Sequence, residues 1–198
     1  MFTGIVSEVG TVRFAGETPS GKRLEIASTA VRERLATGDS VAVAGVCLTV
    51  TGRDDHGFTV EAVPETLART TLGHAARGTR VDLEAAATPT TALGGHFVQG
   101  HVDATVALLA RTPAGDGARL RFALPKGLGR YVVAKGFVTL DGVSLTVAAL
   151  DRRGFEIALI PHTASHTTLG ALREGESVNF EADIIGKYVE RLLGERKR

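Results

Sequence analysis

The chain of 198 residues contains no tryptophan and a single cysteine, Cys47. One cysteine excludes an internal disulfide and suits a reducing compartment, so we expect a cytoplasmic protein. Only 5% of the residues are aromatic, which argues against a base-stacking surface for single-stranded nucleic acid. The net charge of +1 provides no strong attraction to nucleic acid or to an acidic surface.

Long apolar runs and the common cofactor motifs are also missing. The opening residues, MFTGIVSEVG, lack the regions of a signal peptide, and no apolar run is long enough to cross a bilayer, so we expect no membrane association. Residues 16–22 nearly match a phosphate-binding loop, but Arg23 replaces its hydroxyl residue, which favours a plain turn. No Gly-x-Gly-x-x-Gly motif follows a strand. His162 and His166 have a zinc-binding spacing without a third ligand, so we expect no metal site.

The chain does contain an internal repeat. The segment 45–50 (GVCLTV) returns as 142–147 (GVSLTV), five of six residues being identical at an offset of 97. The same offset holds without a gap to Glu84 and Glu181, and upstream it drops to 96, so that Gly4 pairs with Gly100. Such ordered matches on one register indicate a tandem duplication. Two long copies indicate two domains rather than a solenoid, and we expect them at 1–97 and 98–198, joined near the small, Thr-rich and Gly-rich residues 85–95.

Each copy has the pattern of a small all-β domain. Segments such as 40–46, 48–51, 58–63 and 80–84 are rich in apolar and β-branched residues, and Asp-Gly turn signals separate them. Many short strands in about 90 residues favour a closed barrel over a large sandwich. We therefore expect two tandem six-stranded Greek-key β-barrels.

Helices are expected at few places. One short helix per copy should follow Pro64 and Pro161, each ending near a glycine. A longer C-terminal helix, at 184–198, carries an apolar stripe and has no counterpart in the repeat. This stripe either packs on its own barrel or joins copies of the chain, and we favour self-association.

The repeated strand carries the first chemical signal. Cys47 in the first copy is replaced by Ser144 in the second, and Thr49 and Thr146 follow on the same face because residues two apart share a face. These residues are either small core residues or ligand contacts. Hydroxyl groups in an otherwise apolar strand are costly to bury unpaired, which favours a ligand that takes their hydrogen bonds.

With these residues the sequence resembles the α-type riboflavin synthase family, which has two lumazine-binding barrels. Met1 to Val6 is similar to its N-terminal signature, and segments 45–50 and 142–147 are similar to its paired ligand strands. Residues 100–102, 131–136, 160–163 and 187–190 also fit, so the resemblance covers the whole chain in order.

The resemblance implies a dismutation. Two molecules of 6,7-dimethyl-8-ribityllumazine exchange a four-carbon unit, which yields riboflavin and 5-amino-6-ribitylamino-pyrimidinedione, without a metal or a redox cofactor. It also implies a homotrimer joined by the C-terminal helices, with each active site between barrels of neighbouring subunits. Lumazine synthase is a further partner to consider, although the sequence indicates no docking surface for it.

The resemblance also implies a set of ring and ribityl contacts. In the first copy they are Gly4, Ile5, Val6, Cys47, Leu48, Thr49, Glu61, Ala62, Val63, Pro64, Glu65 and Thr66, with Phe2 beside them. In the second copy they are Gly100, His101, Val102, Lys135, Ser144, Leu145, Thr146, Ala158, Leu159, Ile160, Pro161, His162 and Thr163.

The catalytic candidates come from the needs of such a reaction. Ser144 or Cys47 could supply the nucleophile or activate a water, with His101 as proton carrier. Thr146 is a candidate hydroxyl donor, and Asp141 and Asp183 match acidic positions of the family that could orient these groups. Holding two ligands face to face is itself expected to supply much of the rate.

The two copies are not equivalent, and the sequence departs from the family at one position. Ile5 stands opposite His101 in the repeat, and Ala44 replaces an asparagine that many relatives have. The alternative function is a non-catalytic lumazine- or flavin-binding antenna protein, but such proteins typically lose ligand residues in one half. A purely structural barrel oligomer would leave the paired polar strands unexplained.

Overall fold

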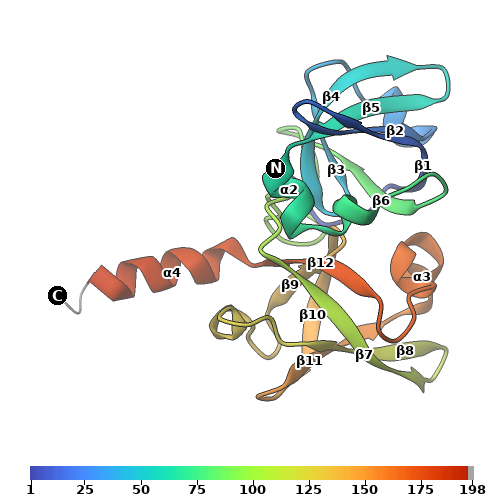
Figure 1. Ribbon diagram of the computed structural model, residues 1–198. Coiled ribbons are helices and arrows are strands. Elements are labelled where there is room, and N and C mark those ends of the chain that lie inside the picture. The colour runs from blue at the N-terminus through green and yellow to red at the C-terminus, as the bar shows by residue number, and fades with distance from the viewer. Residues whose placement is uncertain (196–198) are drawn as a thin grey trace.

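The computed structural model describes residues 1–195 and consists of two closed six-stranded antiparallel barrels and a C-terminal helix (Figure 1). The elements of the first barrel are β1 Glu8–Thr18, β2 Gly21–Ala27, α1 Ala30–Glu33, β3 Ser40–Val43, β4 Val46–Asp54, β5 Gly57–Ala62, α2 Pro64–Arg69, η1 Thr71–His74 and β6 Arg80–Ala85. Those of the second are β7 Ala104–Ala114, β8 Gly117–Ala123, η2 Gly129–Tyr131, β9 Phe137–Leu140, β10 Val143–Leu150, β11 Gly154–Leu159, α3 Pro161–His166, η3 Thr168–Gly170 and β12 Ser177–Ala182.

The two barrels have the same strand order. The first is connected as β1-β2-β5-β4-β3-β6, with β6 pairing back to β1. The second closes in the corresponding way, with β12 between β7 and β9. Each barrel has its own apolar core, and repeat-related residues occupy it, such as Phe58 and Phe155, which are both completely buried. The predicted all-β fold and the duplication are confirmed.

One predicted strand is shorter than the sequence pattern indicated. The apolar run 40–46 is broken by a tight turn at Ala44 and Gly45, which both have positive φ, and Asp141 and Gly142 form the same turn in the second barrel. These turns meet at the junction of the barrels, where a Cβ on Gly45 would lie 2.5 Å from the Gly142 backbone nitrogen. The two residues join the paired strand ends Val43 and Val46, and a two-residue hairpin turn of this kind has positive φ at both positions, which apolar periodicity does not reveal.

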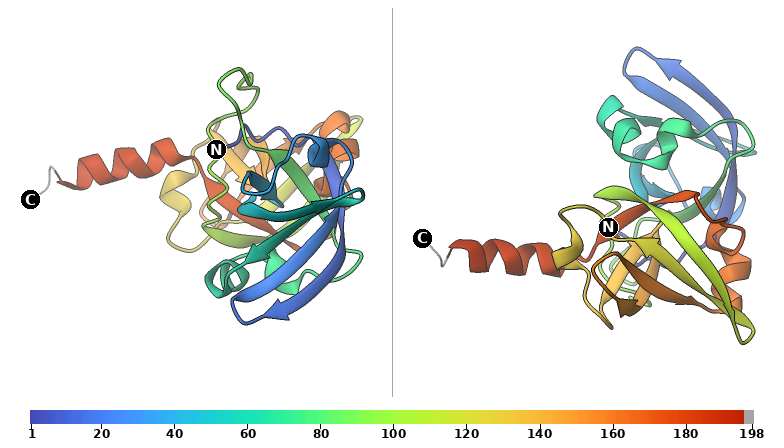
Figure 2. Two further views of the ribbon diagram at one scale, coloured as in Figure 1. Left: turned by 90° about the horizontal axis from the view of Figure 1, so that it is seen from above. Right: turned by 60° about the horizontal axis from the view of Figure 1, so that its bottom comes forward.

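The residues outside the barrels connect the two halves. Phe2 and Val98 pair as an isolated antiparallel bridge, so the segments 2–6 and 98–102 meet at their starts and then run in opposite directions, and we call these the two crossing segments. The linker between β6 and the second crossing segment forms the loop that projects near the N-terminus in Figure 2. The crossing segments bring the start of each copy to the opposite barrel.

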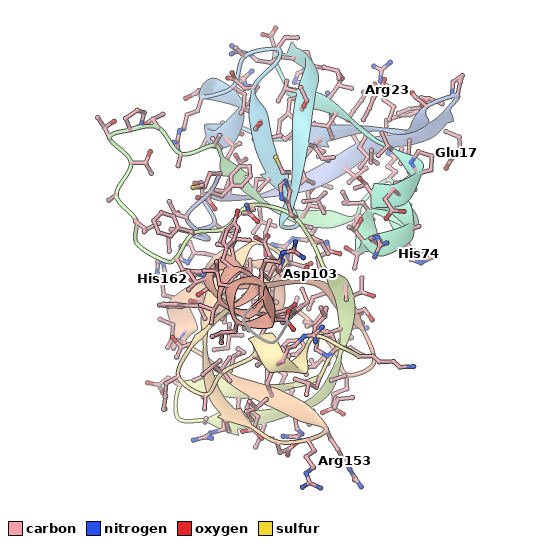
Figure 3. All side chains as sticks on the ribbon, turned by 90° about the vertical axis from the view of Figure 1, so that its left-hand side faces the viewer. Glu17, Arg23, His74, Asp103, Arg153 and His162 are labelled. Atoms are coloured by element: carbon pink, nitrogen blue, oxygen red, sulfur yellow. The ribbon has the colours of Figure 1, made fainter. Side chains whose placement is uncertain are left out.

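The C-terminal helix, α4 (Ile184–Glu195), points away from both barrels (Figures 1 and 2). Residues 196–198, which the sequence also assigned to this helix, lie outside the described residues. Its first turns are held by a Lys187–Asp103 ion pair of 2.8 Å and an Arg130–Glu190 ion pair of 2.8 Å. Figure 3 looks along the helix towards the junction of the barrels, with Asp103 beside it. Among the described residues, no helix has the length and apolar character needed to cross a membrane.

Candidate functional site

The repeated strands β4 and β10 place their polar side chains outward. Cys47 and Ser144 are half-buried and Thr49 and Thr146 are exposed, whereas Leu48 and Leu145 point into the barrel cores. The expected alternation is therefore present in both copies. Of the predicted ligand contacts, Leu48 and Leu145 can offer only their backbone to a molecule outside the barrel.

The ends of β5 and β11 continue these surfaces. Along them, the predicted contacts Glu61, Val63, Ala158 and Ile160 face outward, whereas Ala62 and Leu159 are buried in the cores.

Val63 and Ile160, which are repeat-related, are each more than half exposed, so both barrels present an apolar side chain at the same outward position. After them, Pro64 and Pro161 begin the short helices α2 and α3, as predicted, so the remaining contacts lie in first helical turns, at Glu65, Thr66, His162 and Thr163.

The crossing segments change which residues belong to which site. The Gly4 carbonyl accepts a hydrogen bond from the Ser144 backbone nitrogen at 2.8 Å, and Val6 packs against the second core. In the same way, the Gly100 carbonyl accepts from the Cys47 nitrogen at 2.8 Å, and Val102 packs against the first core. Gly4, Ile5 and Val6, assigned to the first copy from the sequence, thus lie with the second barrel, and Gly100, His101 and Val102 lie with the first. The order of residues along the chain gave the wrong site for these residues, because each crossing segment passes over the opposite barrel before the first strand of its own copy begins.

Ser144 has a partner that the sequence reasoning missed. Its Oγ lies 2.7 Å from His96 Nδ1, and His96 Nε2 lies 3.1 Å from the Thr139 hydroxyl. The imidazole is buried and stacks on Phe137, with ring centroids 5.0 Å apart. Because both ring nitrogens have partners and the ring is fixed by stacking, the imidazole is held in one orientation towards Ser144.

The electrostatics of His96 suit a proton acceptor. Burial lowers the pKa of His96, and the negative charge of Asp183 opposes this by raising it. The lowered pKa keeps the imidazole neutral near pH 7, with a lone pair available for a proton. Asp183 precedes α4 and accepts a hydrogen bond from the Ile185 backbone nitrogen. The sequence candidates Ser144 and Asp183 are therefore brought to one centre through His96.

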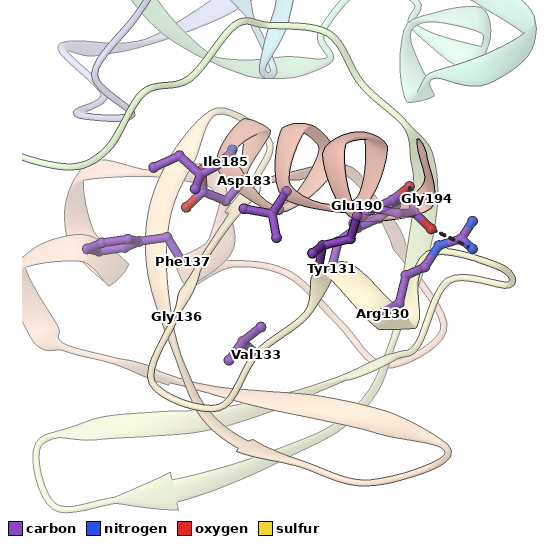
Figure 4. Close-up of a pocket in the computed structure, with 12 residues that line it drawn as sticks. Arg130, Tyr131, Val133, Gly136, Phe137, Asp183, Ile185, Glu190 and Gly194 are labelled. Carbon is purple, nitrogen blue, oxygen red and sulfur yellow. Dashed lines mark hydrogen bonds and ion pairs between the residues drawn. The ribbon is translucent and has the colours of Figure 1, made fainter. Parts of the chain in front are cut away.

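A cavity of about 640 Å³ lies beside this centre, between α4 and the start of β9 (Figure 4). Phe137 and Asp183 line one end of it, and Val133, Ile185 and Val189 make it largely apolar. Its size is in the range of small-molecule sites.

The first barrel offers a different set of groups. Cys47 is a free thiol, and the segment that carries His101 crosses directly over it. His101 is exposed, and its backbone nitrogen donates to Glu181 at 3.0 Å. The Cys47 thiol has no hydrogen-bond partner among the described residues, in contrast to the Ser144 hydroxyl. The two outward surfaces thus have the same frame and different chemistry.

Two predicted residues lie apart from these groups. Asp141 faces the junction of the barrels, where its carboxylate accepts a hydrogen bond from the Asn179 backbone nitrogen at 2.8 Å, and it lines a separate cavity of about 520 Å³. Burial raises the pKa of Asp141 to about 8. Lys135 adopts a positive φ and is exposed after η2, and its backbone nitrogen donates to Val147. Within the described part of the chain, neither side chain forms a hydrogen bond or an ion pair with Ser144, Cys47 or His101.

The two sites combine one neutral imidazole–hydroxyl pair, one thiol and outward apolar side chains. Across residues 1–195 no three His, Cys, Asp or Glu side chains lie together as a metal site would require. The arrangement suits binding of planar polar heterocycles and proton transfer at the second barrel.

His96 was not predicted from the sequence, because it follows the Gly-Gly of the linker and has no counterpart in the first copy. A histidine directly before an apolar residue at the end of a linker was the only available signal.

Comparisons with known proteins agree with this geometry. A family model described as the lumazine binding domain matches residues 3–86 and again residues 99–183. The riboflavin synthases of Mycobacterium bovis and Mycobacterium tuberculosis are each 47% identical over 197 residues, which is 98% of this chain and 98% of theirs. The riboflavin synthase of Bacillus subtilis is 39% identical and covers 98% of this chain and 90% of its own.

Solved structures share the fold. LumP complexed with 6,7-dimethyl-8-(1'-D-ribityl) lumazine superposes with a TM-score of 0.83, and LumP complexed with riboflavin with 0.85. Each covers 92% of this chain and 99% of its own, at 22% identity. At this identity the likeness establishes the arrangement of two barrels.

Proposed function

We infer, because this chain belongs to the riboflavin synthase family, that it forms riboflavin from two molecules of 6,7-dimethyl-8-ribityllumazine. One molecule donates a four-carbon unit to the other, and 5-amino-6-ribitylamino-pyrimidinedione is the second product. The observation that carries this proposal is the pair of matching but unequal surfaces on β4 and β10. A reaction that consumes two copies of one molecule needs two similar sites, and a donor and an acceptor need different chemistry.

The unequal sites indicate that the two bound lumazine molecules undergo different chemical steps. A methyl group of one lumazine must lose a proton, and a nucleophile or an activated water must add to the other molecule. Ser144, with His96 at 2.7 Å as the proton acceptor, is our candidate for this work, and Asp183 adjusts the pKa of His96. The outward backbone and hydroxyl groups of both strands are candidates for holding the ring carbonyls.

The antenna alternative is not favoured. A carrier of one ligand has no need of a second intact surface, and here Cys47 and Thr49 as well as Ser144 and Thr146 face outward. The curated relatives at 38–47% identity are riboflavin synthases over nearly the whole chain.

The direct test is an incubation of the purified chain with 6,7-dimethyl-8-ribityllumazine in a buffer without added cofactor. We expect riboflavin to appear, as followed by its visible absorbance and by chromatography. Tight binding of the lumazine without any riboflavin would contradict the proposal and favour the antenna function.

We further propose that three chains assemble through α4 in the cytoplasm. Large apolar side chains on α4 are about half exposed or more, namely Ile185, Tyr188, Val189, Leu192 and Leu193. An amphipathic helix whose apolar face meets water is stabilised by packing against copies of itself. The cavity beside Phe137 and Asp183 borders this helix, which supports a reaction centre shared between subunits. Lumazine synthase stays a candidate partner, because it would supply the substrate.

A further inference from the structure

Two buried glutamates hold the crossing segments. Glu84 on β6 accepts the Thr3 nitrogen at 2.8 Å and the Thr3 hydroxyl at 2.7 Å through one oxygen, and the Gly4 nitrogen at 3.0 Å through the other. Glu181 on β12 occupies the repeat-related position. It accepts the nitrogens of residues 99, 100 and 101 at 2.7, 2.9 and 3.0 Å. Each carboxylate therefore receives three hydrogen bonds from one short piece of chain.

Each held segment reaches the opposite barrel. Glu84 belongs to the first barrel, but the segment it holds places Gly4 against Ser144 of the second. The contact is tight, since a Cβ on Gly4 would lie 2.6 Å from the Ser144 Cβ, and Gly4 has a φ of +77°. The Thr3 carbonyl also accepts the His96 backbone nitrogen at 3.1 Å. Glu84 thus holds, through Thr3 and Gly4, the backbone that carries both members of the His96–Ser144 pair.

Glu181 has the reverse relation. It belongs to the second barrel, and the segment it holds places Gly100 against Cys47 of the first. A Cβ on Gly100 would lie 2.7 Å from the Cys47 Cβ, so the segment covers the thiol-bearing residue closely. Both glutamates are almost fully buried, at 6% and 3% exposure, and burial raises the pKa of each while the backbone donors lower it. A buried carboxylate with three donors is a rigid anchor.

We propose that Glu84 and Glu181 are crossed positioning residues, each of which lies in one barrel and shapes the lumazine-binding surface of the other. The inference rests on the proposed function for the identity of the ligand. It predicts that a glutamate change disables the site of the opposite barrel and leaves the site of its own barrel in place. A residue that merely stabilised its own barrel would produce the opposite pattern, or damage both sites equally.

The variants are Glu84→Gln and Glu181→Gln, each serving as the matched control for the other. Glutamine keeps the size but removes the charge and turns an NH₂ group towards backbone N–H donors, which leaves donors unpaired. Cys47 is the only cysteine in the chain, so its rate of alkylation by iodoacetamide reports on the first site alone. Calorimetric titration with 6,7-dimethyl-8-ribityllumazine counts the occupied sites per chain.

For Glu181→Gln we expect alkylation of Cys47 to be about tenfold faster, as the covering segment loosens. One tight lumazine site, that of the second barrel, should be left. Saturating ligand should no longer protect Cys47 from alkylation, because the first site is disabled. For Glu84→Gln we expect Cys47 to be alkylated at the same rate as in the unaltered chain. One tight site, that of the first barrel, should be left, and bound ligand should protect Cys47 fully. Faster alkylation in Glu84→Gln with an unchanged rate in Glu181→Gln would overturn the proposal, as would equal effects in both variants.

A milder variant keeps the test decisive if a glutamine variant does not fold. Thr3→Val removes one donor to Glu84 and keeps the carboxylate with its two backbone bonds. It should weaken lumazine binding at one site several-fold without changing Cys47 alkylation, and a changed Cys47 rate would contradict the crossed arrangement. The alkylation rates without ligand do not depend on the proposed function. If the unaltered chain bound no lumazine, that function would fail, while the alkylation comparison would still decide the crossed positioning.

Discussion

At the scale of single residues, the chemistry of each site depends on what its outward-facing side chain meets. The Ser144 hydroxyl meets a buried imidazole whose pKa is lowered, while the Cys47 thiol lies under a glycine of the second crossing segment. The strand frames that present them are equivalent. A duplicated binding surface has therefore acquired two chemical characters through a few substitutions and one histidine that lies outside the repeat.

The His96–Ser144 pair makes a first prediction. His96→Gln should lower the rate of riboflavin formation about 10²-fold, because general base catalysis contributes factors of this size. His56→Gln, in the exposed β4–β5 turn, is the matched control and should retain the full rate. Steady-state kinetics with the lumazine checks both, and a His96→Gln variant with unchanged kcat would remove His96 from the proposed mechanism.

The lowered pKa of His96 makes a second prediction. The neutral imidazole accepts the proton, so kcat/KM should decline on the acid side only below pH 6.5, the ordinary histidine value. Asp183→Asn removes the charge that raises the pKa of His96 and should move this decline to still lower pH. A pH–rate profile of both proteins measures the shift. A decline that moved to higher pH in the variant would contradict the assigned role of Asp183.

The sequence predicted the residues that obey a simple period. Alternation along β4 and β10 correctly placed Cys47 with Thr49, and Ser144 with Thr146, on one face of their strand, and the structure adds that this face is the outer one. His96 could not be found in this way, because its burial comes from the contact of a linker end with Thr139 and Phe137. Such contacts depend on tertiary structure, and no local pattern encodes them.

At the scale of elements, α4 combines a polar attachment to its own barrel with an exposed apolar face. Lys187 pairs with Asp103, which also accepts the Ala182 backbone nitrogen at 2.8 Å. Asp103 directly follows the second crossing segment and its backbone nitrogen donates to Phe180 on β12, so α4 is tied to the second barrel at the point where the chain enters it. The sequence identified the helix and its stripe, but only the structure reveals this connection.

A charge on the apolar face of α4 should dissociate the proposed trimer into monomers. Leu192→Glu places a carboxylate where helices are proposed to pack, and burial of an unpaired charge is costly. We expect monomers in sedimentation velocity and a loss of activity of at least about tenfold, since a shared site would be incomplete. Leu150→Glu makes the same change at an exposed leucine of β10 and should leave the trimer intact. A Leu192→Glu protein that sediments as a trimer would refute this assembly.

Some elements were beyond sequence reasoning for a physical reason. The helices after Pro64 and Pro161 were predicted, because proline and glycine mark their ends. The tight turns at Ala44 and Asp141 were not predicted, because the apolar run continues through them and hides two-residue hairpin turns in which both residues have positive φ. The short α1 lies between β2 and β3, where the second barrel has η2 between β8 and β9, and Glu8 stabilises α1 by accepting the Thr29 and Val31 nitrogens.

At the scale of the whole molecule, the two barrels are joined by a buried polar junction. Asp82 accepts the Thr168 nitrogen and hydroxyl, both at 2.8 Å, and its repeat-related partner Asn179 binds Thr71 and the Ala44 carbonyl. Burial raises the pKa of Asp82 to about 6 and that of Asp141 to about 8. The junction therefore contains two carboxyl groups whose ionisation is disfavoured by burial.

This junction should make stability depend on pH. Because both pKa values are raised above the ordinary 3.8, the folded state holds protons that the unfolded state releases. The stabilisation is complete below pH 3.8 and is lost as pH rises, through about 6 for Asp82 and about 8 for Asp141. The melting temperature should therefore fall between pH 5 and pH 9.

Asp141→Asn should flatten the upper part of this decline. At pH 9 the variant should be more stable than the unaltered chain by about 1–3 kcal/mol, because no buried charge is formed. Asp116→Asn, in the exposed β7–β8 turn, is the control and should leave the decline unchanged. Calorimetry between pH 5 and pH 9 measures the melting temperature of both variants. An equally steep decline of the melting temperature in Asp141→Asn would show that Asp141 does not cause it.

The central claim is that two unequal sites, one on each barrel, serve one reaction between two identical molecules. The most direct measurement is the product balance of a cofactor-free incubation, with the lumazine, riboflavin and the pyrimidinedione all quantified by chromatography. We expect one riboflavin and one 5-amino-6-ribitylamino-pyrimidinedione to form for every two 6,7-dimethyl-8-ribityllumazine molecules consumed. Lumazine recovered unchanged from the protein, with neither product formed, would contradict it.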